Sequence, residues 1–450
     1  MNILFGAFIG LIALTLLVVI HEFGHFIMAE KSGVKVNEFG IGLPPRKLAW
    51  LHLPAKEVQK FYDSLKSESK AKVNQKRLQK LLAMGKDKTK QDKYVWFFIP
   101  STEYKNDPLY KQDYLIFSIN LLPLGGFCTM DGESDAETKP HTFGATNYLQ
   151  KTAILFGGVT MNWIYGVLIF TILAVTGMPQ FMNNQFNINE KAHFTMPKIY
   201  IDKILENSPA SHSTLKANTV IHDAKAKNED NWKVLTSTLD VQDFNKSHLG
   251  QTVIYRTFDP ATKDTSEHEV TLNSGDNSPA LGISMRMDGQ FLARYSVIDA
   301  PLIGLGTTAQ ITGETFRGLY DMIRNLFSGI AKQITGNQET RESGKQELAK
   351  AGESVSGPVG IIGVIFPSFV SAGFTELLFL TAIISISLAC MNVLPIPALD
   401  GGRWTMITIS KLIKKKLSTE LEGKIIATTF LFLFAMFILV TILDLIRIFH

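Results

Sequence analysis

Residues 3–29 have the sequence ILFGAFIGLIALTLLVVIHEFGHFIMA, and this stretch constrains the architecture of the whole chain. It is longer than the ~20 apolar helical residues that cross a hydrocarbon layer about 30 Å thick. Three ionisable side chains, His21, Glu22 and His25, lie near its C-terminal end. Because ionisable groups inside a bilayer are costly and normally mark function, the segment predicts a transmembrane helix that carries a site.

These three residues form an H-E-x-x-H motif, His21-Glu22-Phe23-Gly24-His25. On a helix, positions i and i+4 share a face, so both imidazoles can bind one Zn²⁺ while the glutamate points near the attacking water. Zn²⁺ is the expected cofactor, although His and carboxylate ligands also suit other divalent ions. The alternative, an ordinary surface helix, is disfavoured because the motif lies in an apolar span.

Three further segments are long and apolar enough to span a membrane, so the chain is predicted to be a polytopic α-helical membrane protein with four transmembrane helices. Hydrophobic residues make up 46% and charged residues 19% of the 450 positions, which suits spans joined by water-exposed domains. A cleavable signal peptide would need a basic n-region and a small-x-small site, and the N-terminus lacks both. The other three spans are predicted at residues 152–176, 377–399 and 425–449.

The distribution of charge predicts the orientation of these spans. Lysines and arginines concentrate in residues 30–146 and again at 411–416, whereas residues 178–300 have slightly more acids than bases. By the positive-inside rule the two Lys-rich loops are cytoplasmic, and both termini and the middle domain lie outside. The chain has no basic patch interleaved with aromatics, so no nucleic-acid partner is expected. Cys128 and Cys390 are too few for a disulfide framework.

A catalytic zinc needs a third protein ligand, and Asp400 is the candidate. It lies in residues 392–402, NVLPIPALDGG, where prolines and glycines interrupt an apolar span and free the backbone for local binding. In the predicted orientation the first and third spans both enter the membrane from outside. Their candidate ligands are near the C-terminal ends of the spans and therefore lie toward the cytoplasmic side. The alternative for Asp400 is a helix-terminating carboxylate in cytoplasmic water.

The H-E-x-x-H motif together with Leu399-Asp400-Gly401 resembles the site-2 protease family, which includes the bacterial regulator-of-sigma-E proteases. The resemblance covers both ends of the chain and all of its membrane region. Its further matching pieces are Phe39-Gly40-Ile41-Gly42, Ile119 to Phe127, Gly157 to Asn162, Ser356 to Ile361 and Asn392 to Asp400.

The resemblance implies an intramembrane zinc metalloprotease in a bacterial inner membrane. His21, His25 and Asp400 would bind the metal, and Glu22 would act as general base and then as general acid. Asn392, Pro395 and Pro397 match family positions that help to hold substrate, although a simple helix break explains them as well. The implied partners are the lipid bilayer, single-span membrane proteins such as anti-sigma factors or remnant signal peptides, and an upstream site-1 protease that cuts the same substrate.

The resemblance also implies a membrane-associated β-sheet after the first helix and one external PDZ-like α+β domain. The alternating run 34–39 and residues 114–117 fit strands with one buried face. In the PDZ-like domain, Thr214 to Thr219 departs from the usual Gly-Leu-Lys-x-Gly-Asp loop, so the domain is either a substrate size filter or a spacer without ligand.

Residues 54–93 match no family pattern, and their apolar spacing predicts cytoplasmic helices with a weak apolar face, either a solvated insertion or a partner platform. An amphipathic helix is expected over 301–334, at the membrane surface or packed on the middle domain. Two other functions are possible alternatives: a non-catalytic PDZ-bearing adaptor, which predicts a damaged metal site, and a zinc transporter, which needs polar groups along a route through the bilayer.

The predicted organisation follows the chain from one span to the next. Its parts are the first span with its motif (1–30), a cytoplasmic and membrane-re-entrant β region with the Lys-rich insertion (31–146), the second span (147–177), the external PDZ-like domain (178–297), an amphipathic helix and linker (298–376), the third span with the Leu-Asp-Gly motif (377–402), a cytoplasmic loop (403–424) and the fourth span (425–450).

Overall fold

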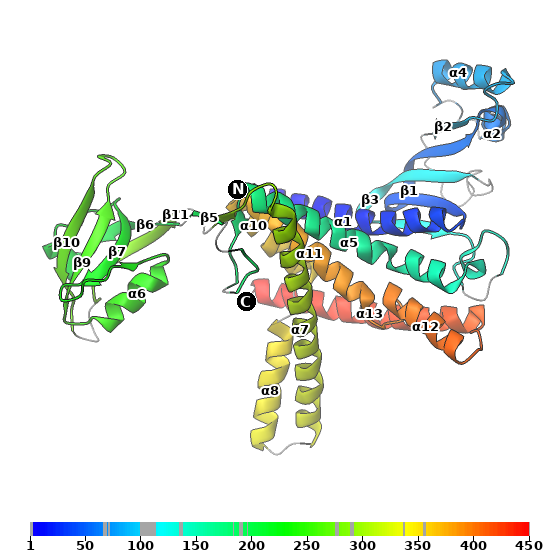
Figure 1. Cartoon of the computed structure of the whole chain (residues 1–450). Helices are drawn as coiled ribbons and strands as arrows, with labels where there is room; N and C mark the ends of the chain where they lie inside the picture. Colours follow the sequence, from blue (N-terminus) through cyan, green and yellow to red (C-terminus); the bar gives the residue numbers. More distant parts are fainter. Residues whose placement is uncertain are drawn as a thin grey trace. The chain divides into compact units, whose positions relative to one another are not determined.

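The computed structural model of the chain divides into two compact units, Met1–Leu173 with Ala300–His450, and Ala174–Asp299 (Figure 1). Ser356 and residues 66–69 and 71–72 of the predicted insertion lie outside the described residues. The structure describes residues 3–65, 70, 73–99, 114–134, 138–182, 184–188, 192–195, 197–274, 279–288, 292–335, 338–353 and 357–449.

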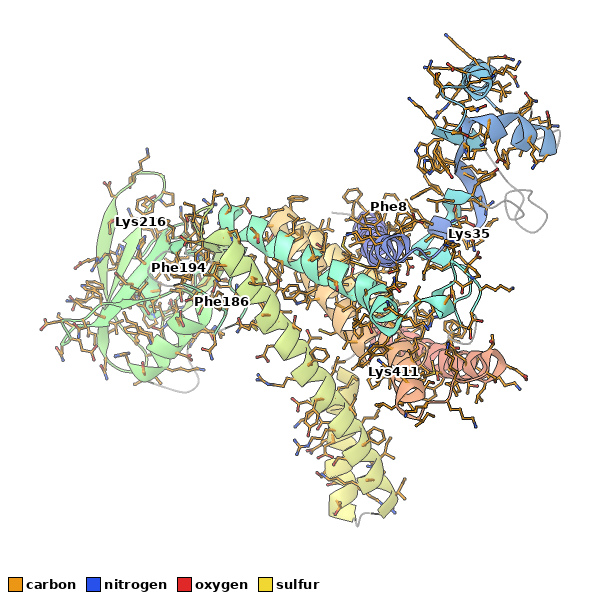
Figure 2. The ribbon with its side chains drawn as sticks, turned by 45° about the vertical axis from the view of Figure 1, so that its right-hand side comes forward. Phe8, Lys35, Phe186, Phe194, Lys216 and Lys411 are labelled. Atoms are coloured by element: carbon orange, nitrogen blue, oxygen red, sulfur yellow. The ribbon has the colours of Figure 1, made fainter. Side chains whose placement is uncertain are left out.

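Four helices in the described part of the chain are long and apolar enough to cross a membrane, as predicted. Many of their apolar side chains are free to contact lipid, and Phe8 (Figure 2) is 58% exposed. The helices are α1 (Ile3–Lys31), α5 (Tyr148–Thr176), α11 (Phe374–Val393) and α13 (Thr419–Phe449).

The third span is shorter than predicted, because α11 ends at Val393 and not at residue 399. Residues 394–399 form an irregular connection that includes Pro395 and Pro397, which have no backbone N–H with which to continue a helix. A separate helix, α12 (Asp400–Leu412), then begins at Asp400. The break therefore places this carboxylate in the first turn of a new helix.

Small residues let α1 approach its neighbours closely. A Cβ atom added at Gly24 would lie 2.1 Å from the carbonyl oxygen of Gly157 on α5, and one at Gly157 would lie 2.5 Å from the Gly24 oxygen. Contact between backbones through such residues is how membrane helices pack without a hydrophobic driving force. Near its N-terminus, α1 packs in the same way against α10 (Phe366–Ala372).

An antiparallel sheet of three strands follows α1, in the order β2-β1-β3. Its strands are β1 (Val36–Pro54), β2 (Tyr94–Ile99) and β3 (Leu115–Met130), so β1 and β3 extend well beyond the predicted short strands. The pairing of β1 with β3 is irregular between Val36 and Leu48. Buried Arg46 makes two hydrogen bonds to buried Glu38 across this irregular part.

The Lys-rich insertion is a folded extension of this sheet. Its helices α2 (Val58–Ser64) and α4 (Gln75–Lys86) pack on one face of the sheet. Of the apolar residues predicted to form a weak helical face, all but the partly buried Leu82 are interior residues of this small core, together with the inward side chains of the strands. Core members from the insertion are Ala55, Val58, Phe61, Leu65, Val73, Leu78 and Leu81.

The amphipathic segment predicted over 301–334 is the long helix α7 (Ala300–Thr335). Helix α8 (Gln338–Glu353) packs along it, and Gly329 of α7 and Gly344 of α8 allow close contact. Lys332 and Glu347 join the two helices by an ion pair of 2.6 Å.

The unit Ala174–Asp299 has its own core, built on a sheet with the strand order β10-β9-β7-β6-β11. Helix α6 (Thr238–Ser247) contributes Val241 and Phe244 to that core. The strands are β6 (Lys198–Ile204), β7 (Val220–Ala226), β9 (Thr252–Phe258), β10 (Thr265–Thr271) and β11 (Ile283–Asp288), with β8 (Lys233–Val234) paired to β7. A second small sheet contains β4 (Met178–Pro179), β12 (Leu292–Arg294) and β5 (His193–Thr195).

Candidate metal centre

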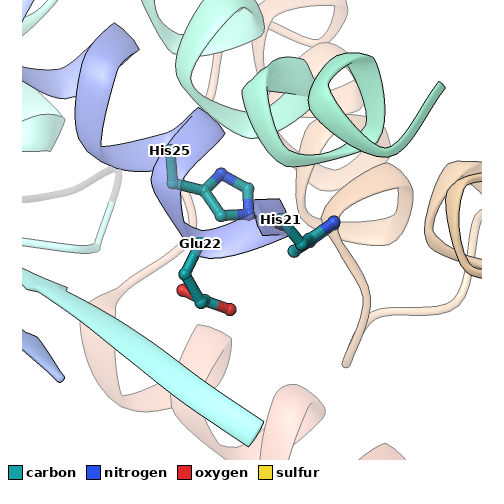
Figure 3. Close-up of side chains that lie close together, drawn as sticks. All are labelled: His21, Glu22 and His25. Atoms are coloured by element: carbon teal, nitrogen blue, oxygen red, sulfur yellow. Dashed lines mark hydrogen bonds between the residues drawn. The ribbon is translucent and has the colours of Figure 1, made fainter. Parts of the chain in front are cut away.

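Helix α1 carries both histidines of the motif on one face, four residues apart. Their Nε2 atoms lie 3.2 Å from each other, and the ring planes are nearly perpendicular, with an angle of 81°. Both side chains are buried. Figure 3 shows them close together on α1 with Glu22.

Asp400 completes the cluster from the first turn of α12. Its Oδ2 lies 3.1 Å from His21 Nε2 and 3.4 Å from His25 Nε2. Three ligand atoms at about 2.0–2.1 Å from a tetrahedral Zn²⁺ lie about 3.3–3.4 Å apart, so these separations fit the ion. The structure thus brings together the three residues predicted as metal ligands, and their donor set of two imidazoles and one carboxylate suits zinc.

Helix α5 orients the imidazoles from the side opposite the cluster. His25 Nδ1 lies 2.8 Å from the carbonyl oxygen of Ile154, so it donates its proton there and leaves Nε2 free as a ligand. The side-chain nitrogen of Asn162 lies 3.4 Å from His21 Nδ1, whereas Asn162 Oδ1 has no hydrogen-bond partner among the described residues. Rotating this amide by half a turn makes Oδ1 the acceptor of the His21 proton.

Gly158 gives the two rings their space. A Cβ atom there would lie 2.6 Å from His21 Nε2 and 2.7 Å from His25 Nε2. The sequence identifies Gly157 to Asn162 as a matching motif, but it does not indicate a role in ring orientation. The Ile154 acceptor is a backbone carbonyl, which any residue type supplies and no sequence signal marks.

The Glu22 side chain lies near both the two histidines and the sheet. One carboxylate oxygen of Glu22 and the ligand nitrogens of His21 and His25 all lie within 4.8 Å of one another. The backbone N–H of Cys128 on β3 donates a hydrogen bond to this carboxylate. The glutamate is therefore placed between the metal cluster and a strand.

The predicted substrate-binding residues lie on the segment that leads to Asp400. Asn392 is in the last turn of α11, where its Nδ2 donates to the Leu388 carbonyl at 3.0 Å. Pro395 and Pro397 follow in the connection, which folds over the start of α12. A Cβ at Gly402 would lie 2.0 Å from the Ile396 oxygen, so this fold requires glycine there. The role of the three residues toward substrate stays a prediction.

Comparison with known proteins agrees with this arrangement. The sequence model of peptidase family M50 matches residues 9–54 and 110–436. The chain belongs to peptidase family M50. As an M50 peptidase it is a zinc metalloprotease of the site-2 type, and the resemblance found from the motifs is confirmed.

Bacterial relatives align with this M50 peptidase over nearly its whole length. A predicted zinc metalloprotease of Clostridium acetobutylicum is 24% identical, with 98% of this chain and 97% of the relative covered. The regulator of sigma E protease of Haemophilus influenzae is 23% identical, with 93% of each chain covered. The zinc metalloprotease RasP of Oceanobacillus iheyensis is 22% identical, with 96% of this chain and 97% of the relative covered.

Proposed function

We propose that this M50 peptidase hydrolyses peptide bonds within or next to the transmembrane segments of single-span membrane proteins. The observation that carries the proposal is the convergence of His21, His25 and Asp400 from two helices within a membrane-spanning region. Anti-sigma factors and remnant signal peptides are the proposed substrate classes. They would arrive after an earlier cut by a site-1 protease.

The residues of the cluster divide the chemistry between them. His21, His25 and Asp400 would hold Zn²⁺, which when bound would act as a Lewis acid toward a carbonyl group and lower the pKa of a bound water. Glu22 accepts a proton from the attacking water and passes it to the leaving amine. The contacts from α5 keep both imidazoles oriented, so that the ligand set is formed before substrate arrives.

The position of β3 supports a route for the substrate backbone. A transmembrane helix hides its carbonyl groups in its own hydrogen bonds, and must unwind before it can be cut. β3 is an edge strand of its sheet, and Cys128 on this strand contacts Glu22. An unwound segment that pairs with an edge strand replaces the hydrogen bonds it has lost, close to the general base.

We take the unit Ala174–Asp299 to be the PDZ-like domain predicted at 178–297. We place it outside the cytoplasmic membrane with both termini, and the metal cluster toward the cytoplasmic side, because the two Lys-rich loops obey the positive-inside rule in this orientation. In this position the unit would act as a size filter for shortened substrates. The altered loop at Thr214 to Thr219 leaves a spacer role as its alternative.

The test is cleavage of a single-span model substrate by the reconstituted wild-type protein and by Glu22→Gln, with bound zinc measured in both. Loss of the general base is expected to slow cleavage by about 10²–10⁴-fold while zinc stays bound. If the wild-type protein cleaves no tested transmembrane substrate while clients still co-purify with it, the adaptor function replaces the protease function.

A further inference from the structure

The sheet that carries the insertion has an open face of unusual composition. On β1, Leu51 and Leu53 are buried beneath the insertion helices, while Trp50 and His52 alternate with them and point to the opposite side. An antiparallel sheet with one solvated face normally has polar side chains on that face. Here the open face is aromatic, so something other than water is expected to cover it.

The ring side chains of this face are paired across neighbouring strands, and one row of them spans all three strands. Trp50 is paired with Phe98 on β2 and with Phe117 on β3, and the Trp50 and Phe98 rings lie 5.2 Å apart. In the next row His52 stacks on Trp96 at 4.5 Å. We call these five residues the aromatic face. Three of them, Trp50, Trp96 and Phe117, line a shallow, almost wholly apolar groove of about 340 Å³ together with Phe39, Ile41, Ser118 and Ile119.

The aromatic face is continuous with a membrane-spanning helix. Phe117 lies 5.6 Å from both Phe39 on β1 and Phe26 on α1, measured between ring centroids. Trp96 extends the chain of ring contacts outward, 5.3 Å from Phe117. Figure 1 shows β1 and β3 running from beside α1 to the helices α2 and α4. The aromatic face therefore begins beside a helix that is long and apolar enough to cross a membrane.

The insertion beneath the aromatic face is strongly basic. Residues 55–93 hold twelve Lys and Arg against five Asp and Glu, a formal charge of +7, whereas the whole chain has +4. Basic segments next to a span are attracted to anionic lipids of the cytoplasmic leaflet, by about 1 kcal/mol per basic residue near the surface. The family model leaves residues 55–109 unmatched, so β2 and both insertion helices are additions to the common family pattern.

We propose that the aromatic face lies in the headgroup region of the anionic cytoplasmic leaflet and anchors the insertion to the membrane surface. Trp and Tyr favour this depth because their rings are apolar at one end and polar at the other. Tyr94, 61% exposed beside Trp96 at 40%, belongs to the same contact. The proposal rests on the cytoplasmic placement of the insertion, and it implies that β3 is held in a fixed orientation to the bilayer beside Glu22.

The test uses the full-length protein, labelled with fluorotryptophan, in nanodiscs. The ¹⁹F signals of Trp50 and Trp96 are assigned with Trp50→Phe and Trp96→Phe, and Trp232 of the other unit serves as the internal control. A lipid with a nitroxide on its headgroup is expected to broaden the signals of Trp50 and Trp96 but not that of Trp232. A water-soluble gadolinium chelate is expected to do the reverse.

Three outcomes would overturn the proposal. If the chelate alone broadens Trp50 and Trp96, the face is in water. If neither agent broadens them, protein covers the face. If broadening by the lipid label is the same with and without phosphatidylglycerol, the anionic lipid is not the partner. An intact signal from Trp163 in α5 shows in each case that the spans are folded, and a failed protease assay leaves this readout unaffected.

A pair of matched variants gives a second measurement. Tyr94→Gln with Trp96→Gln removes two exposed aromatic side chains from the face, and should reduce the broadening of Trp50 by the lipid label at least twofold. Val234→Gln with Leu239→Gln removes two exposed apolar side chains from the other unit and should leave Trp50 unchanged. Equal broadening of Trp50 in both variants would contradict the anchor.

Discussion

Gly158 has no side chain, and the metal centre requires this absence. The space beside its Cα is filled by the His21 and His25 rings, and any Cβ would meet both at less than 3.0 Å. Close contact of this kind couples the position of α5 directly to the geometry of the metal ligands. Residues that orient metal ligands typically affect metal affinity by about 10–100-fold when changed.

Gly158→Ala is therefore expected to lower zinc affinity by at least about 10-fold, and cleavage with it. The measurement is zinc content after dialysis against a graded chelator. Gly313→Ala in α7 is the matched control, because a Cβ there meets nothing within 4 Å. Unchanged zinc affinity in Gly158→Ala would show that the rings can move aside.

Among structural elements, β1 depends on a buried ion pair. Glu38 and Arg46 are 2% and 1% exposed, and join through hydrogen bonds of 2.7 and 3.1 Å. Ser118 of β3 donates to the same carboxylate at 2.6 Å. Removal of one partner leaves a buried charge without compensation, whereas replacement of both by apolar groups is often neutral.

Glu38→Ala is expected to destabilise the fold by about 3–5 kcal/mol, and Glu38→Leu with Arg46→Leu by much less. Thermal unfolding in detergent, followed by the fraction of soluble protein, compares the two variants with wild type. A double variant as unstable as Glu38→Ala would show that the ion pair itself fixes the irregular pairing of β1 with β3.

In the unit Ala174–Asp299, burial lowers the pKa of His268 on β10, and the charge of Lys216 lowers it further. The neutral ring lies between Thr214 at 2.6 Å and Thr257 at 2.9 Å. The unfolded chain binds the proton at a pH near 6.5, above the folded pKa, so the free energy of unfolding falls as the pH drops below about 6.5.

The expected outcome is that β10 amides lose protection between about pH 7 and pH 5, while His268→Gln makes the protection nearly independent of pH. Hydrogen exchange on the full-length protein, corrected for the intrinsic exchange rate at each pH, gives this comparison. Equal pH dependence in the variant would assign the effect to another group.

For the molecule as a whole, the sequence predicted the features that rest on long apolar runs and on motifs. The four spans and the convergence of His21, His25 and Asp400 follow from hydropathy, helical spacing and depth. The early end of α11 was missed because the apolar run continues through Pro395, although proline there already argued for a break. The acceptor at Ile154 could not be found, since it depends on how two helices pack.

The fold of the insertion was also beyond sequence reasoning. Its helices have a weak apolar pattern by themselves, and they acquire a core only through the inward side chains of strands on either side of them in the sequence. The pairing of Leu51 on β1 with Phe97 on β2 joins residues far apart in the chain. A local pattern carries no information about such a partner.

The proposed orientation predicts which parts of the chain reach each side of the membrane. Exposed Lys88 and Asp230 are suitable for Lys88→Cys and Asp230→Cys. In spheroplasts, a membrane-impermeant maleimide should label Asp230→Cys at once and Lys88→Cys only after permeabilisation. The wild-type chain controls for Cys128 and Cys390. The reverse pattern would invert the topology and move the metal cluster toward the outer side.

The metal cluster combines residues that are translated at very different times. His21 and Asp400 are 379 positions apart, so α1 enters the membrane long before α12 exists. With Asp400 as the third ligand, a partly translated chain has two imidazoles and no complete site. With this ligand set, peptidase activity therefore requires nearly all of the chain to be translated and inserted.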